Sequence, residues 1–311
     1  MPKSRLWKWI SRILIVLAFL LLVFFLIVIP VFITHVMTHA QTRPMDLQIK
    51  TTPMDLGVAY NDVAFAVKTE SAADSASISG WYLPKEDARG IIIYAHGLFR
   101  SRQEVLNRAV DLWNAGYAAL LIDLRRHGKS TAAKSGMGYL ERGDVLAAIS
   151  FVKDSLKVQV PVITYGVSMG AVATLLANAE TTDVDAIIID SSFLSFDHTL
   201  DHHLKLWFGW PRFPVGTLIS ALAKWRIGFS SDDFDMRKAL DKIGKRPVLF
   251  FAGAEDRRMP PAVARELATH CQGESELIIV PGARHGHAYD VDPSVFVNNI
   301  TAFLDRVLKK E

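Results

Sequence analysis

The sequence is poor in cysteine: Cys271 is the only one among 311 residues. A single cysteine excludes an internal disulfide and a cysteine-based metal site, so we expect it to be a small buried hydrophobic side chain. After its first 12 residues the chain also lacks a basic excess, with 31 Lys and Arg against 32 Asp and Glu. A nucleic-acid partner is not expected, because such proteins need a basic surface. Repeats and low-complexity tracts are lacking too, which excludes solenoid architectures.

Charge is absent from one long segment near the N-terminus. The 21 residues from Ile13 to Ile33 contain no charged or strongly polar side chain. At about 1.5 Å of rise per residue, a helix of this length covers about 30 Å, the thickness of the hydrocarbon core of a bilayer. The segment therefore predicts a transmembrane helix. A cleaved signal peptide with its cleavage site near Ala40 is the alternative, although its apolar region would usually be shorter, about 7–15 residues.

The charges that flank this segment predict its orientation. Four basic residues precede it: Lys3, Arg5, Lys8 and Arg12. Only Arg43 and Lys50 follow it closely, so the positive-inside rule places the N-terminus in the cytoplasm and the rest of the chain outside it. The expected organisation is a cytoplasmic basic N-terminus (residues 1–12), a single-pass transmembrane helix (13–34), a connection (35–53) and one large domain (54–311).

The large domain alternates short apolar segments with stretches of helical length. Two segments alternate in polarity and predict an antiparallel edge, Val63–Val67 and Ile78–Leu83. Six segments are apolar on both faces, as parallel strands covered by helices on both sides are: Ile91–Tyr94, Ala118–Ile122, Val162–Tyr165, Ile187–Ile189, Val248–Phe251 and Leu277–Val280. The fold class is therefore α/β. The interval at about 193–235 is too long for an ordinary crossover and predicts an inserted helical cap.

A glycine-flanked serine stands between a predicted strand and a predicted helix. The motif is Gly166-Val167-Ser168-Met169-Gly170, after the strand segment Val162–Tyr165 and before a small-residue helix. A nucleophilic serine on such a turn needs glycine on both sides, because the backbones pass closely there. The pattern predicts a nucleophile elbow with Ser168 as the nucleophile.

A serine hydroxyl needs a histidine to take its proton and a carboxylate to orient that histidine. Two loops that follow predicted strands C-terminal to Ser168 supply candidates for the carboxylate and the histidine. Glu255 and Asp256 follow one predicted strand, and His285 and His287 follow the next. The order serine, carboxylate, histidine is the one expected for a sheet of this kind.

At this point the chain resembles the α/β hydrolases, closest to single-domain serine hydrolases such as esterases, acyl-glycerol lipases and serine aminopeptidase-like proteins. Four stretches carry the resemblance: the His96-Gly97 turn, residues 123–130, the serine elbow, and the Asp256 and His285 loops. The resemblance favours Asp256 over Glu255 and His285 over His287. It also implies that the backbone N–H groups of Leu98 and Met169 hold the oxyanion. His96 is expected to shape this loop and not to act as a base. One departure is Arg126, where the family often has glycine.

Other chemistry-bearing residues have structural interpretations. Ser101-Arg102-Gln103-Glu104 reads as a capping box, and Ser191 and Ser192 end a strand. A cluster in the cap with helical spacing allows a metal site, although a solvated helix face is the expected role: Asp197, His198, Asp201, His202 and His203. The aromatic stretch Leu206–Pro211, with Phe213, is expected to line an acyl pocket, touch a bilayer or pack the cap. No cofactor or metal is expected.

These observations predict a membrane-anchored serine hydrolase that cleaves an ester or thioester through an acyl-serine intermediate. A lipid-like or small acyl substrate is expected as its partner. A serine peptidase resembling the aminopeptidases is one alternative. A non-catalytic, membrane-anchored binding protein of hydrolase fold is the other, because fold does not determine function.

Overall fold

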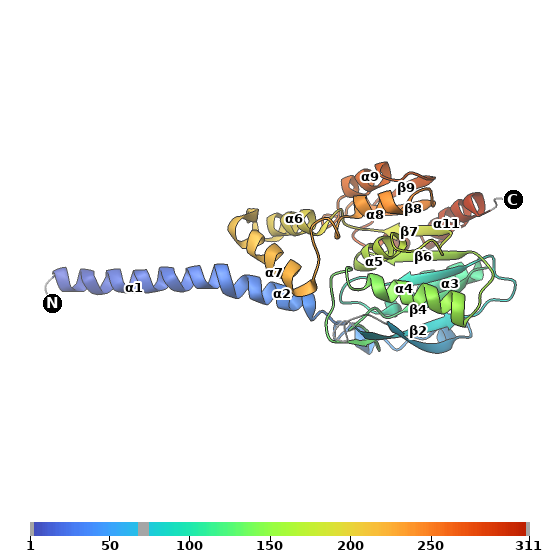
Figure 1. Ribbon diagram of the computed structural model, residues 1–311, viewed down its shortest axis with the longest axis horizontal. Coiled ribbons are helices and arrows are strands. Elements are labelled where there is room, and N and C mark those ends of the chain that lie inside the picture. The colour runs from blue at the N-terminus through green and yellow to red at the C-terminus, as the bar shows by residue number, and fades with distance from the viewer. Residues whose placement is uncertain (1–2, 68–74, 309–311) are drawn as a thin grey trace.

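The computed structural model describes residues 3–67 and 75–308, so the first two residues of the predicted basic segment lie outside it. Its strands are β1 (Asn61–Val67), β2 (Ala76–Leu83), β3 (Ile91–Ala95), β4 (Ala118–Ile122), β5 (Thr131–Ala132), β6 (Val162–Val167), β7 (Ala186–Asp190), β8 (Val248–Gly253) and β9 (Ser275–Val280). They form one sheet in the order β1-β2-β4-β3-β6-β7-β8-β9, and β5 pairs with β2 (Figure 1). All pairs from β4 to β9 are parallel, whereas β2 is antiparallel to β1, β4 and β5. The predicted α/β sheet with an antiparallel edge is confirmed.

Helices cover both faces of this sheet because alternate residues of each central strand are apolar on opposite sides. The helices around it are α3 (Leu106–Asn114), α4 (Arg142–Ser150), α5 (Met169–Asn178), α8 (Met236–Ile243), α9 (Pro261–Thr269), α10 (Ala288–Val291) and α11 (Pro293–Val307). Ile91 and Ile93 belong to the buried cluster that includes α4, α5, α8 and α9. Ile92 and Tyr94 belong to the cluster with α3, α10 and α11. Successive side chains of one strand point to opposite faces of the sheet, so each central strand contributes to two hydrophobic cores. Short 3-10 or π segments complete the domain: η2 (Asp46–Gln48), η3 (Pro53–Leu56), η5 (Arg102–Val105) and η6 (Phe151–Ser155).

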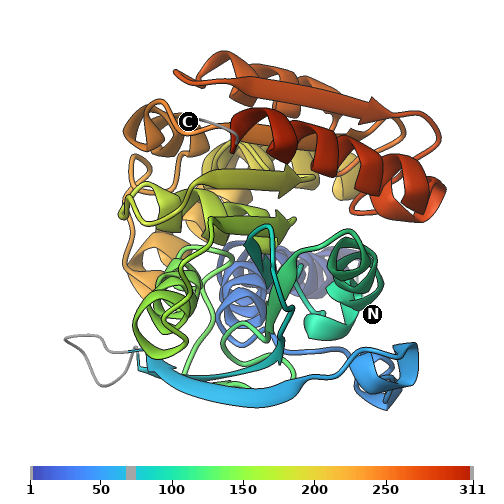
Figure 2. The ribbon, with the colours of Figure 1, turned by 90° about the vertical axis from the view of Figure 1, so that its right-hand side faces the viewer.

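The N-terminal segment is one long helix made of three parts, α1 (Lys3–Val23), the π-helical η1 (Phe24–Val28) and α2 (Ile29–Thr38). It projects from the domain in Figure 1 and is seen end-on in Figure 2. The stretch Arg5–Thr38 is long and apolar enough to be a candidate membrane span. The helix continues through Thr38, four residues into the predicted connection. It ends where Ser135 satisfies the last carbonyls: its hydroxyl donates to Met37 O and its N–H to Thr38 O, at 2.8 and 2.9 Å.

The long interval between β7 and α8 contains α6 (Phe196–Phe208), the π-helical η7 (Arg212–Gly216) and α7 (Thr217–Ile227). The side chain of Ser195 accepts the N–H of His198 at the start of α6, and Gly209, with φ of 66°, ends it. In Figure 1 both cap helices lie on the side of the domain from which the N-terminal helix emerges. The cap therefore lies beside the part of the N-terminal helix that is nearest the domain.

Candidate active site

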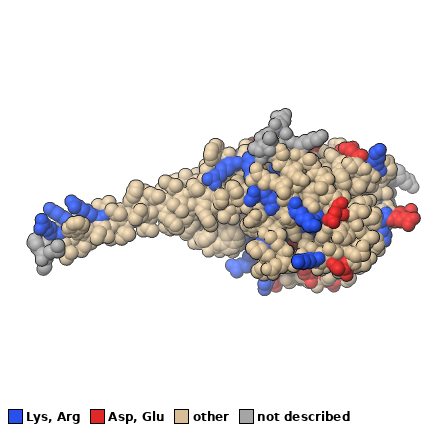
Figure 3. Space-filling view, turned by 90° about the horizontal axis from the view of Figure 1, so that it is seen from below, with Lys and Arg blue, Asp and Glu red and all other residues tan. Residues whose placement is uncertain are grey.

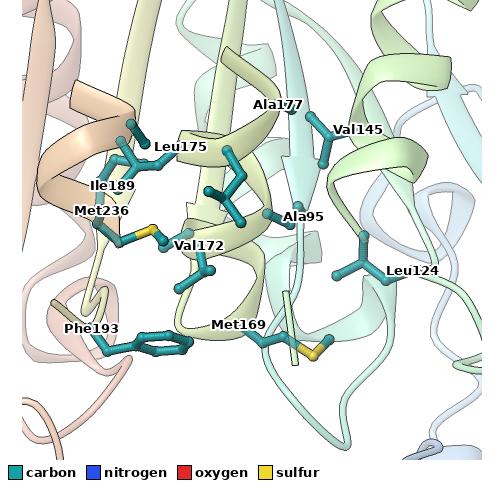
Figure 4. Close-up of a cluster of buried hydrophobic side chains, with 14 of the residues drawn as sticks. Ala95, Leu124, Val145, Met169, Val172, Leu175, Ala177, Ile189, Phe193 and Met236 are labelled. Atoms are coloured by element: carbon teal, nitrogen blue, oxygen red, sulfur yellow. The ribbon is translucent and has the colours of Figure 1, made fainter. Parts of the chain in front are cut away.

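Ser168 occupies a strained turn between β6 and α5, with φ of 53° and ψ of −113°. The two neighbouring positions must be glycine because there is no room for a Cβ atom at either of them. A Cβ on Gly166 would lie 2.4 Å from the carbonyl oxygen of Gly170, and one on Gly170 would lie 2.2 Å from that of Ala95. Helix α5 is held in place by packing, and Figure 4 shows Val172 and Leu175 in one cluster with side chains from β7 and α8. The strain at the serine is thus supported by a rigid strand and a buried helix.

The structure brings Ser168, His285 and Asp256 together from three separate loops. The Nε2 atom of His285 is 2.8 Å from Ser168 Oγ, and its Nδ1 atom is 2.7 Å from Asp256 Oδ2. The carboxylate is buried, and its Oδ1 accepts the backbone N–H groups of Arg258 and Met259. Because Oδ1 is held by the backbone of the Asp256 loop, Oδ2 is directed at His285. This arrangement lets His285 accept the serine proton through Nε2 while Nδ1–H donates to Asp256.

The two rival residues have other partners, although His287 lines the polar cavity that also contains Ser168 and His285. His287 is exposed, and its Nδ1 is 2.5 Å from Asp290 Oδ2. Glu255 has an exposed side chain, although its N–H is bonded to the carbonyl of Ala283. Neither is joined to Ser168 by a hydrogen bond among the described residues.

The loop after β3 passes close to the serine and holds His96 in a structural role. The Nδ1–H of His96 donates to Gly97 O at 2.8 Å, and its Nε2 accepts the N–H of Leu124 at 3.0 Å. Burial, above all, holds the pKa of His96 well below its usual value, so the ring stays neutral. A Cβ on Gly97 would lie 3.5 Å from Ser168 Cβ, which puts this loop and the following N–H of Leu98 beside the elbow. Both imidazole nitrogens are occupied, so His96 has no free site for proton transfer.

Glu104 differs from the expectation drawn from the sequence. In a capping box its carboxylate would accept the N–H of Ser101. Instead Oε2 accepts the N–H of Gly97 at 2.6 Å, and Oε1 is 3.2 Å from Arg100 Nε. The Ser101 side chain makes no capping hydrogen bond. Burial raises the pKa of Glu104, and the Gly97 N–H opposes this shift. Glu104 therefore orients the loop that carries Leu98, a role that no local pattern indicated.

A buried polar network at the end of β7 supports the elbow and the histidine loop. The backbone oxygen of Asp190 accepts the N–H of Ser168 at 2.9 Å. Its carboxylate accepts from Tyr165, Arg108 and Ser191 at 3.1, 3.4 and 2.9 Å. Ser191 Oγ also accepts the N–H of Gly286. Burial raises the pKa of Asp190, and the charge of Arg108 opposes the shift. Sequence reasoning missed this network, because Arg108 and Asp190 are 82 residues apart.

Two cavities meet at Ser168. One has a volume of about 300 Å³ and is lined almost entirely by apolar side chains, with Met169 beside the serine and Leu200 and Trp207 from α6. The other, of about 250 Å³, is polar and includes Arg108, Arg258 and His285. The serine oxygen thus stands at a boundary between an apolar and a charged environment.

The cap residues with metal-ligating side chains do not converge. Asp197 bonds to Arg212 and Lys224, both at 2.8 Å; burial alone would raise its pKa, but these and two serine hydrogen bonds lower it. The ring of His203 stacks on Trp207 with centroids 4.5 Å apart, and burial lowers its pKa to about 4. His202 Nε2 is bonded to the carbonyl of Arg257 instead. Across residues 3–67 and 75–308 no group of three His, Cys, Asp or Glu is placed to hold a metal.

The aromatic stretch of the cap is largely exposed. Trp207, Phe208 and Phe213 are 58, 52 and 75% exposed, so they do not form the core of the cap. Trp207 and Phe208 line the apolar cavity. Trp210 packs against Phe25 of the N-terminal helix, with ring centroids 5.6 Å apart.

Arg126 stands where the resemblance led us to expect glycine. Its φ is 62°, in the left-handed region, and its Nη1 donates to the carbonyl of Ala133 at 3.0 Å. Two residues later, a Cβ on Gly128 would lie 2.0 Å from Asp123 Oδ2. Arg126 therefore takes up the left-handed backbone conformation that glycine adopts most readily.

A parallel sheet with a serine elbow at its centre, and a histidine and an aspartate on loops after β9 and β8, defines an α/β-hydrolase fold. The solved Pyrococcus furiosus esterase Pf2001 shares it, with a TM-score of 0.67 over 83% of this chain and 96% of that one, at 24% identity. The chain belongs to the serine aminopeptidase S33 family (Hydrolase_4), whose model matches residues 86–242. It is therefore a hydrolase of esterase-like fold.

Two curated relatives are similar over most of the chain. The uncharacterized protein YqkD of Bacillus subtilis is 28% identical over 74% of this chain and 76% of its own length. Protein bem46 of Schizosaccharomyces pombe is 23% identical over 68% of this chain and 65% of its own. The family match ends at residue 242 and so contains Ser168 but neither Asp256 nor His285.

Proposed function

We propose that this protein is a membrane-anchored serine hydrolase that cleaves a carboxylic ester or thioester through an acyl-serine intermediate. The observation that carries the proposal is the hydrogen-bonded series Ser168 Oγ, His285 and Asp256, at 2.8 and 2.7 Å, on a glycine-flanked elbow. An intact series of this kind has no purpose in a protein that only binds, which argues against the binding-protein alternative.

The geometry supports a two-stage reaction. His285 Nε2 takes the proton of Ser168 as Oγ attacks the acyl carbon, and the N–H groups of Leu98 and Met169 hold the resulting oxyanion. Collapse of this intermediate breaks the bond to the leaving group, which receives the proton from His285. A water molecule then gives a proton to His285 and attacks the acyl carbon, which releases the acid and restores Ser168. Asp256 keeps the imidazole in the required tautomer throughout.

The two cavities support a lipid-like ester as the substrate. An acyl chain fits the apolar cavity beside Met169, and a polar leaving group fits the charged cavity beside Arg258. Peptide cleavage is the second candidate, because the family is described as serine aminopeptidase. Comparing kcat/KM for a matched acyl ester and an aminoacyl p-nitroanilide separates the two, and a preference for the anilide would favour the peptidase.

Membrane anchoring is supported by the N-terminal helix. On the face shown in Figure 3, its length between the basic end and the domain carries no charged side chain. The helix also packs against α7 of the cap, and its last carbonyls, those of Met37 and Thr38, accept from Ser135, which favours retention over cleavage after Ala40. The basic N-terminal end supports a cytoplasmic N-terminus and an extracytoplasmic catalytic domain. Observed activity of a C-terminal reporter that functions only in the cytoplasm would contradict this orientation.

The experiment that tests the proposed chemistry is labelling of the purified full-length protein by a fluorophosphonate. Ser168→Ala and His285→Ala are expected to abolish labelling, because they remove the nucleophile and its base. His287→Ala is the matched control and is expected to label like the wild type, since His287 faces Asp290. A folded wild-type protein that does not label would favour the binding-protein alternative.

A further inference from the structure

The apolar cavity beside Ser168 has a third wall besides the catalytic domain and the cap. The N-terminal helix contributes four side chains to its lining: Phe32, Ile33, Val36 and Met37. All four belong to the candidate span Arg5–Thr38, although Val36 and Met37 lie just past residues 13–34, the span that the sequence predicts. The cavity is therefore incomplete without the last two turns of that helix.

These turns are docked to the domain. Helix α2 packs along α7 of the cap, and Arg226 Nη1 donates to the carbonyl of Val31 at 3.3 Å. One to two helical turns before Val31, Phe25 packs against Trp210 of the cap. At the end of the helix, Ser135 donates a hydrogen bond to the carbonyl of Met37. A flexible tether would not have these contacts at both ends of one segment.

The spacing of the apolar residues assigns two faces to this part of the helix. Every fourth residue packs against the hydrophobic core: Phe25, Ile29, Ile33 and Met37. Phe32 precedes Ile33, and Val36 precedes Met37. The side chains of Phe32 and Val36 line the cavity and remain 64 and 37% exposed. Residues three to four apart share a helix face, so the core-facing row fixes the direction in which Phe32 and Val36 point.

The position of the cap along the helix places the cavity at the edge of the hydrocarbon core, because Phe32 and Ile33 line it and lie next to that edge. A hydrocarbon core about 30 Å thick that begins near Ile13 extends about 20 residues, to about Ile33. Contact with the cap already begins at Phe25, about 12 Å before that boundary. The cap also exposes Trp207, Phe213 and Trp225 at 58, 75 and 77%. Aromatic side chains of this kind are typical of a surface that lies in the membrane interface.

We propose that α2 is a wall of the acyl-binding site, and that the site takes the long acyl chain of a membrane lipid ester. The chain lies between α2 and α6, and its carbonyl reaches Ser168. The proposal rests on the proposed function and adds to it a substrate class and a role for the helix beyond tethering. The helix then sets which acyl chains the enzyme accepts.

The test is a substitution that fills the cavity from the helix side. Val36→Trp is compared with Val28→Trp, a control on the same helix whose side chain is 47% exposed and does not line the cavity. Full-length proteins in lipid nanodiscs are given p-nitrophenyl esters from acetyl to palmitoyl. For Val36→Trp, the ratio of kcat/KM for the palmitoyl ester to kcat/KM for the acetyl ester is expected to fall by about tenfold or more. The indole ring would occupy space that several methylene groups of the palmitoyl chain fill in the wild type. Val28→Trp is expected to keep the wild-type ratio.

Two outcomes would overturn the proposal: a ratio unchanged in Val36→Trp, or a ratio that falls equally in Val28→Trp, which indicates a general effect on the helix. Fluorophosphonate labelling of each protein reports the serine separately, so a wild type that does not label contradicts the proposed function instead. If Val36→Trp fails to fold, Val36→Ala replaces it. Its loss of wall contacts is expected to raise KM for the palmitoyl ester about fourfold, and an unchanged KM would overturn the proposal.

Discussion

The hydroxyl of Ser191 accepts the backbone N–H of Gly286 at 3.1 Å and donates to Asp190 at 2.9 Å, which joins the end of β7 to the loop that carries His285. In the part of the chain that the structure describes, Ser191 makes no hydrogen bond to Ser168, His285 or Asp256, yet it holds the residue next to the histidine. It is a positioning residue for His285.

We expect Ser191→Ala to slow fluorophosphonate labelling by about two- to tenfold, because one hydrogen bond contributes about 0.5–1.5 kcal/mol. Ser192→Ala is the matched control, since among the described residues the Ser192 hydroxyl bonds only to the neighbouring Phe193 carbonyl, at 3.3 Å. Labelling rates of the two variants against wild type check the prediction. Equal rates in all three would show that the Gly286 contact does not position the histidine.

Replacing Asp256 by asparagine is expected to lower kcat by about 10⁴-fold. The amide no longer selects the His285 tautomer whose Nε2 faces Ser168 Oγ. Glu255→Gln is the control, because its side chain is exposed. Steady-state hydrolysis of a p-nitrophenyl ester measures both, and a large loss in Glu255→Gln with a small one in Asp256→Asn would reassign the carboxylate.

A methyl group added at Gly170 is expected to destabilise the protein by about 1–3 kcal/mol, because it would meet the Ala95 carbonyl at 2.2 Å. The melting temperature should fall by about 2–12 °C. Gly143→Ala is the contrasting change: Gly143 lies in α4, and its added Cβ would have only ordinary contacts from 3.4 Å. Alanine is favoured over glycine in a helix, so that variant should melt at or above the wild-type temperature. Melting in detergent by intrinsic fluorescence measures both variants, and equal shifts would contradict the prediction.

Cys271 is expected to react slowly with iodoacetamide. Burial raises the pKa of its thiol to about 11, so at pH 8 about 0.1% of it is thiolate. In denaturant, where a cysteine pKa is about 8.5, the same residue should be alkylated quickly. Mass spectrometry of the native and the unfolded protein after a fixed exposure compares the two. Rapid alkylation of the folded protein would show an accessible thiol.

Much of the fold could be read along the chain because its signals are local. The six parallel strands were recognisable because strands covered on both faces need apolar residues at every position, as in Ile91–Ala95. The elbow was recognisable because Gly166 and Gly170 have no room for a Cβ. Glu104 was misread because its spacing from Ser101 suits a capping box, and only the folded loop offers it the N–H of Gly97 instead.

The sequence by itself determined every strand except the two-residue β5, the serine on its turn, the candidate span and the pairs of residues from which the carboxylate and the histidine had to come. Each of these follows from steric or hydrophobic requirements within about 20 neighbouring residues. The residues alone left His285 and His287 open, and only the resemblance favoured His285; the tertiary structure places His285, 117 residues from Ser168, within hydrogen-bond distance of the serine oxygen. It also decided that the N-terminal helix lines the apolar cavity. Such contacts depend on how distant loops and helices pack, and no local periodicity records that packing.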